Sequence, residues 1–169
     1  PPRSTLFPYT TLFRSRASFF MQNLSTTQAE EIRVQGEIAL PVGKARTSFI
    51  DVRDIAAVAV RTLTEAQHVD RIYTLTGGES LDYTEVAAKL SLVLNRRIRY
   101  TNPSAVQFIA RQLQAGQKLD YTLVVAALYT ITRFGNAKQT SRDVEAILGR
   151  APISFDQFAY DYRACWQPA

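Results

Sequence analysis

The sequence predicts an α/β fold with a few short strands and about six helices. One observation is the composition: 46% of the 169 residues are hydrophobic and 21% are charged, as is usual for a globular domain. A second is a set of short β-favouring runs. These runs are residues 37–40, 47–50, 72–76 and 98–100. A third is that apolar residues recur at helical spacing in the segments between these runs. The apolar helix faces that result would need a larger sheet to pack against than these runs supply, so we expect further strands outside this sequence.

Capping residues mark where the predicted helices begin. Asp51 is expected to cap a helix by accepting from the backbone N–H of Asp54, and Asp82 with Glu85 has the pattern of a capping box. Before them, Pro41-Val42-Gly43 predicts a hairpin or a tight loop. The predicted helices cover residues 51–63 and 82–95, two segments between 104 and 133 that Gly116 separates, 140–149, and the segment from 154 onward.

Charge and residue counts argue against several classes of partner. The basic residues behind the formal charge of +5 are scattered, and the cluster at 96–99 is expected to be a solvated helix end, so we expect no nucleic-acid partner. The single Cys165 cannot form an internal disulfide, which fits a cytoplasmic protein. With His68 as the one histidine, we expect no metal site. The most apolar stretch, residues 123–131, is too short to span a bilayer, so no membrane partner is expected.

Residues 1–15 (PPRSTLFPYTTLFRS) match, residue for residue, one reading frame of the universal adapter ligated to DNA for short-read sequencing. The alternative is a natural leader, but the segment has neither the unbroken apolar core nor the cleavage site of a targeting signal. We therefore expect residues 1–15 to be an adapter-derived artefact and residues 16–169 to be the natural portion, with the gene interrupted before Arg16. Removing Arg3 and Arg14 lowers the 20 basic residues to 18 against 15 acidic ones, a net charge of +3.

Five short motifs follow one another after residue 15. Residues 16–24 (RASFFMQNL) are similar to an R-P-x-F-F-M-x-N-L segment, with alanine in place of the proline, and residues 48–56 (SFIDVRDIA) are similar to a strand-to-helix turn. The other three are residues 73–77 (YTLTG), 82–87 (DYTEVA) and 147–152 (ILGRAP). In this order they resemble the NmrA-like branch of the atypical short-chain dehydrogenase/reductase superfamily, over essentially all of the chain after residue 15.

The resemblance implies a Rossmann-like NmrA-type fold of which this chain is the C-terminal, substrate-side half, with the N-terminal dinucleotide-binding half missing. It implies NADP or NAD as the cofactor of the full-length protein. The G-x-G-x-x-G turn that binds a pyrophosphate is absent, since Gly77-Gly78 lacks that spacing and is expected to be a plain turn. We therefore expect this chain to bind no dinucleotide well. No catalytic residue is assigned, because Tyr83 is followed four places on by Ala87 rather than by lysine.

Ser18, Phe19 and Phe20 are the candidate cofactor-binding residues. The resemblance places this segment near the nicotinamide end, where an aromatic wall excludes water and orients the ring. The alternative is that both phenylalanines belong to the core, although neighbours on an extended segment point in opposite directions. Asp51 and Asp54 resemble a carboxylate pair, but capping explains them better than acid–base chemistry.

Four further residues are candidates for a substrate pocket. Gln22 and Asn23 are expected to be polar pocket groups, with a helix start as the alternative interpretation. Tyr121 and Tyr129 are expected to line the same pocket, although an amphipathic helix face would explain them equally well.

The resemblance implies a fragment of an NAD(P)H-dependent oxidoreductase with a small-molecule substrate, such as a quinone or a small carbonyl compound. The alternative is an NAD(P)-sensing regulatory protein that binds a protein partner and performs no chemistry. The chain itself is expected to be inactive, because the parts that hold the cofactor lie outside it.

Overall fold

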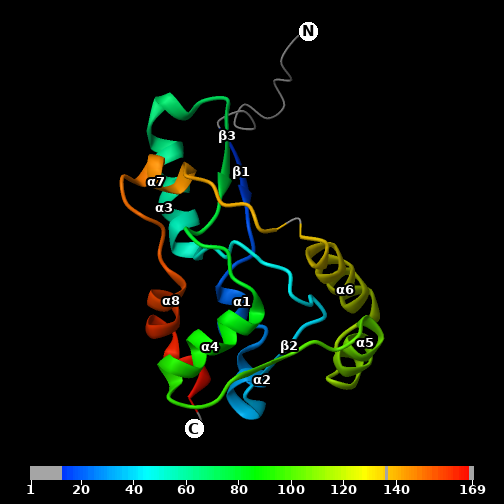
Figure 1. Cartoon of the computed structure of the whole chain (residues 1–169). Coiled ribbons are helices and arrows are strands. Elements are labelled where there is room, and N and C mark those ends of the chain that lie inside the picture. Colours follow the sequence, from blue (N-terminus) through cyan, green and yellow to red (C-terminus); the bar gives the residue numbers. More distant parts are fainter. Residues whose placement is uncertain (1–12, 136, 168–169) are drawn as a thin grey trace.

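Two small parallel sheets form the β structure of the part of the chain that the structure describes (Figure 1). The computed structural model describes residues 13–135 and 137–167. Strand β1 (Phe13–Ala17) pairs with β3 (Arg71–Leu75), and β2 (Glu37–Ala39) pairs with β4 (Arg99–Thr101). In each pair the amino-terminal residues lie opposite one another, so the carboxyl ends of the two strands also meet. The predicted α/β class is confirmed.

Eight α-helices accompany these strands in the described part of the chain, two more than the sequence predicts. They are α1 (Gln22–Ser25), α2 (Ala29–Gln35), α3 (Val52–Thr64), α4 (Tyr83–Leu94), α5 (Ala105–Gln114), α6 (Leu119–Arg133), α7 (Asp143–Leu148) and α8 (Phe155–Asp161). The two additional helices are α1 and α2, which are short. Helix α7 begins at Asp143 rather than at residue 140, because the Ser141 hydroxyl accepts from the N–H of Asp143 (3.1 Å).

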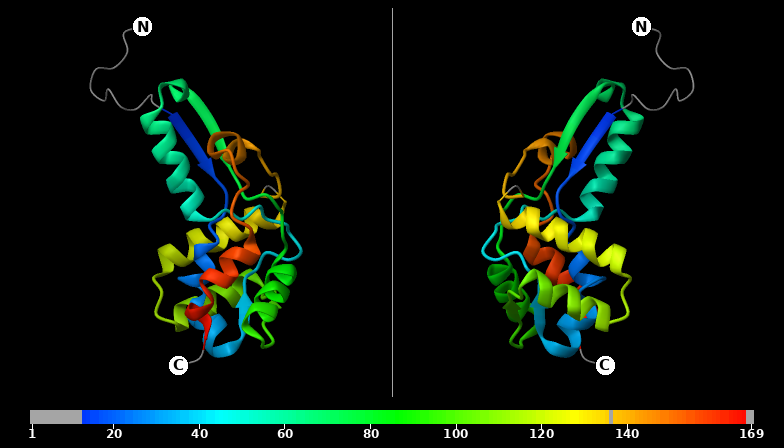
Figure 2. Two further views of the ribbon diagram at one scale, coloured as in Figure 1. Left: turned by 90° about the vertical axis from the view of Figure 1, so that its left-hand side faces the viewer. Right: turned by 90° about the vertical axis from the view of Figure 1, so that its right-hand side faces the viewer.

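The elements form an elongated arrangement (Figures 1 and 2). The β1–β3 pair, α3 and α7 occupy one end, and the hairpin of α5 and α6 lies to the side of the other helices. One apolar cluster fills the helical end and includes Trp166, Phe155 and Phe158, all fully buried. A smaller cluster, with Ile50 and Leu75 among its members, packs α3, β3 and α7 together at the β1–β3 end. The segment that leads from β1 to the helical end therefore lies between these two apolar clusters.

Local capping explains where α3 and α4 begin. The Asp82 carboxylate accepts from the N–H of Glu85 (2.9 Å), and Glu85 accepts in return from the N–H of Asp82 (2.9 Å), so the predicted capping box is confirmed. Asp51 caps α3, but it accepts from the N–H of Arg53 (2.8 Å) rather than from that of Asp54. That detail of the prediction is wrong because an N-cap side chain reaches either of two successive donors in the first turn.

The segment around residues 41–50 agrees with its prediction only in part. Residues 41–44 form a turn, which is the predicted tight loop rather than the hairpin, because β2 pairs with the distant β4. Residues 47–50 form no regular strand; instead Thr47 bridges to Leu81 and Ile50 bridges to Phe20. Residues 47–50 thus connect the segment before α4 with the segment after β1.

Strand β1 includes residues 13–15, which belong to the segment that matches the adapter. They lie opposite Arg71, Ile72 and Tyr73 in the parallel register. Ladder hydrogen bonds join backbone groups, so this pairing places little demand on side-chain identity. The rest of the adapter-like segment, residues 1–12, lies outside the described residues. Among the described residues, no helix is long and apolar enough to cross a membrane.

Candidate functional site

The chain that leaves β1 is fixed by backbone hydrogen bonds at the carboxyl end of the strand pair. The N–H of Ser18 donates to the Leu75 carbonyl at the end of β3 (2.9 Å). The N–H of Ile50 donates to the Phe19 carbonyl, and the N–H of Met21 donates to the Ile50 carbonyl (both 2.9 Å). Residues 18–21 are therefore hydrogen-bonded both to the end of β3 and to the segment around Ile50. They lie at the carboxyl end of a parallel strand pair, where parallel sheets commonly bind ligands.

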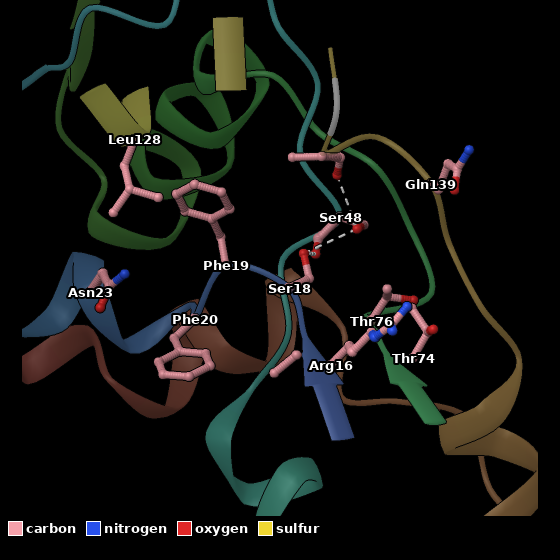
Figure 3. A pocket seen from close by; sticks show the side chains of 12 residues that line it. Arg16, Ser18, Phe19, Phe20, Asn23, Ser48, Thr74, Thr76, Leu128 and Gln139 are labelled. Atoms are coloured by element: carbon pink, nitrogen blue, oxygen red, sulfur yellow. Dashed lines mark hydrogen bonds between the residues drawn. The ribbon is translucent and has the colours of Figure 1, made fainter. Parts of the chain in front are cut away.

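A pair of serines closes one wall of this region. The Ser18 hydroxyl donates to the backbone carbonyl of Ser48, and the two hydroxyl oxygens lie 3.1 Å apart (Figure 3). Ser48 is buried, and its own hydroxyl donates to the Ala137 carbonyl (3.1 Å). The hydroxyl of Ser18 is thus already engaged within the protein.

A cavity of about 590 Å³, here called the outer chamber, lies beside this segment. Phe19 points toward Leu128 on α6, whereas Phe20 points to the opposite side and is 41% exposed (Figure 3). The two phenylalanines therefore present aromatic surface in two directions. The outer chamber is lined by Arg16, Ala17, Ser18, Phe19, Phe20, Asn23, Ser48, Thr74, Thr76, Leu128, Ala137 and Gln139.

A second cavity of about 150 Å³, the inner chamber, adjoins the first. Phe19, Asn23 and Leu128 line both chambers, so these three side chains form the boundary between them. The remaining walls come mainly from α5 and α6. They are Thr27, Gln28, Phe108, Gln112, Tyr121, Thr122, Val125 and Tyr129.

Comparison with known proteins gives this geometry a context. No family model matches the sequence. Over 153 residues the chain is 37% identical to the NAD(P)H azoreductase of Xenophilus azovorans, a match that covers 89% of this chain and 52% of that protein. The chain is similar to about half the length of NAD(P)H-dependent reductases of the NmrA-like, atypical short-chain dehydrogenase/reductase type.

Solved structures show the same fold for this chain. Triphenylmethane reductase of Citrobacter sp., complexed with NADP(H), matches with a TM-score of 0.79 at 20% identity, over 87% of this chain and 51% of that one. The Escherichia coli quinone oxidoreductase QOR2, complexed with NADPH, also matches with a TM-score of 0.79 at 20% identity, over 86% and 51%. The chain spans about half the length of the curated relatives it matches. Its fold is the C-terminal half of the NmrA-type fold, as predicted.

The structure brings six of the seven predicted site residues to the two chambers. Ser18, Phe19 and Phe20 line the outer chamber, and Phe19 also packs against the large core cluster, so both interpretations of that side chain describe it in part. Asn23 lines both chambers. Tyr121 and Tyr129 line the inner one.

Gln22 lies elsewhere. Its amide nitrogen donates to Asp51 Oδ1 (2.9 Å) and its amide oxygen accepts from the N–H of Val52 (3.0 Å). Gln22 also begins α1, and it lines neither chamber. This geometry gives the side chain a bridging position between α1 and the start of α3.

The two aspartates of α3 make structural contacts. Burial alone would raise the pKa of Asp51, but hydrogen bonds from Arg53 and Gln22 outweigh it and hold the pKa below its ordinary value. Asp54 accepts from Arg150 Nη2 and from the N–H of Ile153 (both 2.7 Å), so it anchors the chain between α7 and α8. Both carboxylates are fully buried and neither lines a chamber.

Several wall residues were missed in the sequence. Thr74 and Thr76 lie at the carboxyl end of β3, and polar residues at such a strand end are the signal that could have identified them. Gln28 and Leu128 carry no comparable local signal, because their position depends on how α6 packs against the loop after α1. Among the described residues, no group of three His, Cys, Asp or Glu side chains is placed to hold a metal ion.

Proposed function

We propose that the full-length protein is an NAD(P)H-dependent oxidoreductase that reduces a small molecule in the outer chamber. The observation that carries the proposal is the position of that chamber, at the carboxyl ends of two parallel strands and against the Phe19 and Phe20 side chains. The NAD(P)H azoreductase relative supports it. The two structural neighbours, a triphenylmethane reductase complexed with NADP(H) and a quinone oxidoreductase complexed with NADPH, support it as well.

The residues of the outer chamber fit the nicotinamide end of such a cofactor. Phe19 and Phe20 offer apolar aromatic surface, and Thr74 offers a hydroxyl group. The cofactor, when bound, supplies a hydride. The role of this chain is to exclude water from the ring and to hold the substrate beside it. Because the sequence contains no glycine-rich pyrophosphate turn, we propose that this chain binds the dinucleotide poorly without the other half.

Residues 16–169 are proposed to be the natural substrate-side portion of this enzyme, preceded here by adapter-derived residues 1–15. A quinone or a small carbonyl compound is the proposed substrate. The exposed free thiol of Cys165 fits a reducing compartment, so we propose a cytoplasmic location.

The test is turnover by the natural full-length protein. We expect loss of NADPH absorbance in the presence of quinones or small carbonyl compounds. Phe20→Leu should lower kcat/KM up to about tenfold, as expected for an aromatic contact. The matched control is Phe134→Leu, because Phe134 is 79% exposed and lines neither chamber. Cofactor binding without turnover on the whole panel would contradict the proposal and favour the regulatory alternative.

A further inference from the structure

We infer that the inner chamber is a specificity subsite for one uncharged ring that carries a hydrogen-bond-accepting oxygen. The inference rests on the proposed function, because it assigns the substrate of the outer chamber a second part that enters the inner one. It starts from the size of the inner chamber, about 150 Å³. A protein cavity of about this volume holds one benzene ring.

The walls of the inner chamber contain no Asp, Glu, Lys or Arg side chain within the described part of the chain. One carboxylate outside these walls, that of Glu31, contributes to the raised pKa of Tyr129 and is paired with Arg111 (2.7 Å). A charged ligand group in the inner chamber would therefore lose its hydration without gaining a counter-ion from the chamber walls. The chamber thus selects against charge.

The Tyr129 hydroxyl of the inner chamber is oriented to donate a hydrogen bond to a ligand. Gln28 is buried, and its amide nitrogen donates to the Tyr129 hydroxyl oxygen (3.4 Å). Because the phenol oxygen accepts this bond, its own proton remains available for a ligand. Burial, followed by smaller effects of Tyr121 and Glu31, raises the pKa of Tyr129 to about 12, so the phenol keeps that proton at neutral pH.

Packing keeps the Tyr129 ring in place. The ring of Phe108 meets it edge-to-face, with the centroids 5.6 Å apart and the planes at 86°. The wall also contains Thr122, whose buried hydroxyl has no hydrogen-bond partner among the described residues. The inner chamber therefore combines aromatic surface with polar groups that the protein has not fully used, which suits a ring bearing a carbonyl oxygen.

Acetophenone and 4-acetylbenzenesulfonate form a matched pair of probes, since each has one ring and one carbonyl and only the second carries a charge. Each is titrated into the 169-residue chain, and amide chemical shifts report the affinity and the place of binding. We expect acetophenone to shift amides of α5 and α6 and to bind at least tenfold more tightly than the sulfonate. Equal affinities within about twofold, or shifts confined to other elements, would overturn the inference.

Three variants test whether the inner chamber causes the preference for the uncharged probe. Tyr129→Phe keeps the ring and should weaken acetophenone binding roughly two- to tenfold, the value of one neutral hydrogen bond. Tyr160→Phe is the control, because Tyr160 is exposed on α8 and lines neither chamber; it should leave the affinity unchanged. Gln112→Arg adds a cation to the half-buried wall of α5 and should increase sulfonate affinity several-fold.

Wild-type affinity of the Tyr129→Phe variant, or no gain of sulfonate binding by Gln112→Arg, would contradict the inference. These readouts are independent of hydride transfer. A full-length protein that oxidises NADPH while the two probes bind equally would refute the subsite alone. Selective probe binding without turnover would refute the proposed function alone.

Discussion

Replacing Gly77 with alanine tests how closely the end of β3 approaches the segment that precedes α3. A Cβ built on Gly77 would lie 2.1 Å from the carbonyl oxygen of Phe49, about 1 Å inside the shortest separation that real Cβ atoms show. The neighbour is backbone, held by the hydrogen bonds of residues 48–50, so it cannot turn aside as a flexible side chain would. Relief therefore requires a shift of either β3 or that segment.

Overpacking of this kind costs typically 1–3 kcal/mol, and we expect Gly77→Ala to lower the free energy of unfolding by about 3 kcal/mol, at the upper end of that range. Urea unfolding monitored by the fluorescence of buried Trp166 measures it, and the midpoint should fall by roughly 1–2 M. Gly78→Ala is the adjacent control, because nothing lies within 4 Å of its built Cβ and its φ is outside the left-handed region. Equal midpoints for the two variants would refute the close approach.

Two further predictions concern the helix starts. Because the pKa of Asp51 is lowered in the folded state, its contribution to stability is present above its ordinary value of 3.8 and is lost as the pH falls through the folded value. Urea midpoints should therefore drop more between pH 5 and pH 3 for the wild type than for Asp51→Asn, and parallel curves would contradict this assignment. Asp82→Ala removes the capping box of α4 and should cost about 1 kcal/mol, whereas Thr84→Ala, at an exposed position of the same turn, should cost under about 0.5 kcal/mol. A smaller loss for Asp82→Ala than for Thr84→Ala in the same urea assay would show that the cap is unimportant.

The elements that the sequence predicted correctly are those whose signals are local. The capping box of Asp82 and Glu85 spans four residues, and Gly149 ends α7 in the left-handed conformation. The division of residues 104–133 into α5 and α6 at Gly116 is likewise a local effect. Such features depend on neighbouring residues alone, so a single sequence is enough to identify them.

The missed features depend on distant parts of the chain. The partner of β2 is β4, whose residues Arg99–Thr101 lie about sixty positions away in the sequence, and a parallel pair leaves no turn signal between its strands. Helices α1 and α2 are too short to show a full apolar stripe. At the candidate site, Phe19 and Asn23 follow from the motif at residues 16–24, but the boundary that Leu128 completes depends on the tertiary position of α6.

The most direct test of the central claim is a long read of the source DNA across the codon for Arg16, with no adapter ligated at that point. The outer chamber lies at the carboxyl ends of two parallel strands, and among the described residues these two strands form a sheet of their own. We expect the reading frame to continue upstream for roughly a hundred residues or more and to encode a strand, a glycine-rich turn and a helix. A stop codon just upstream, with Met21 as the first residue, would contradict a dinucleotide-dependent enzyme.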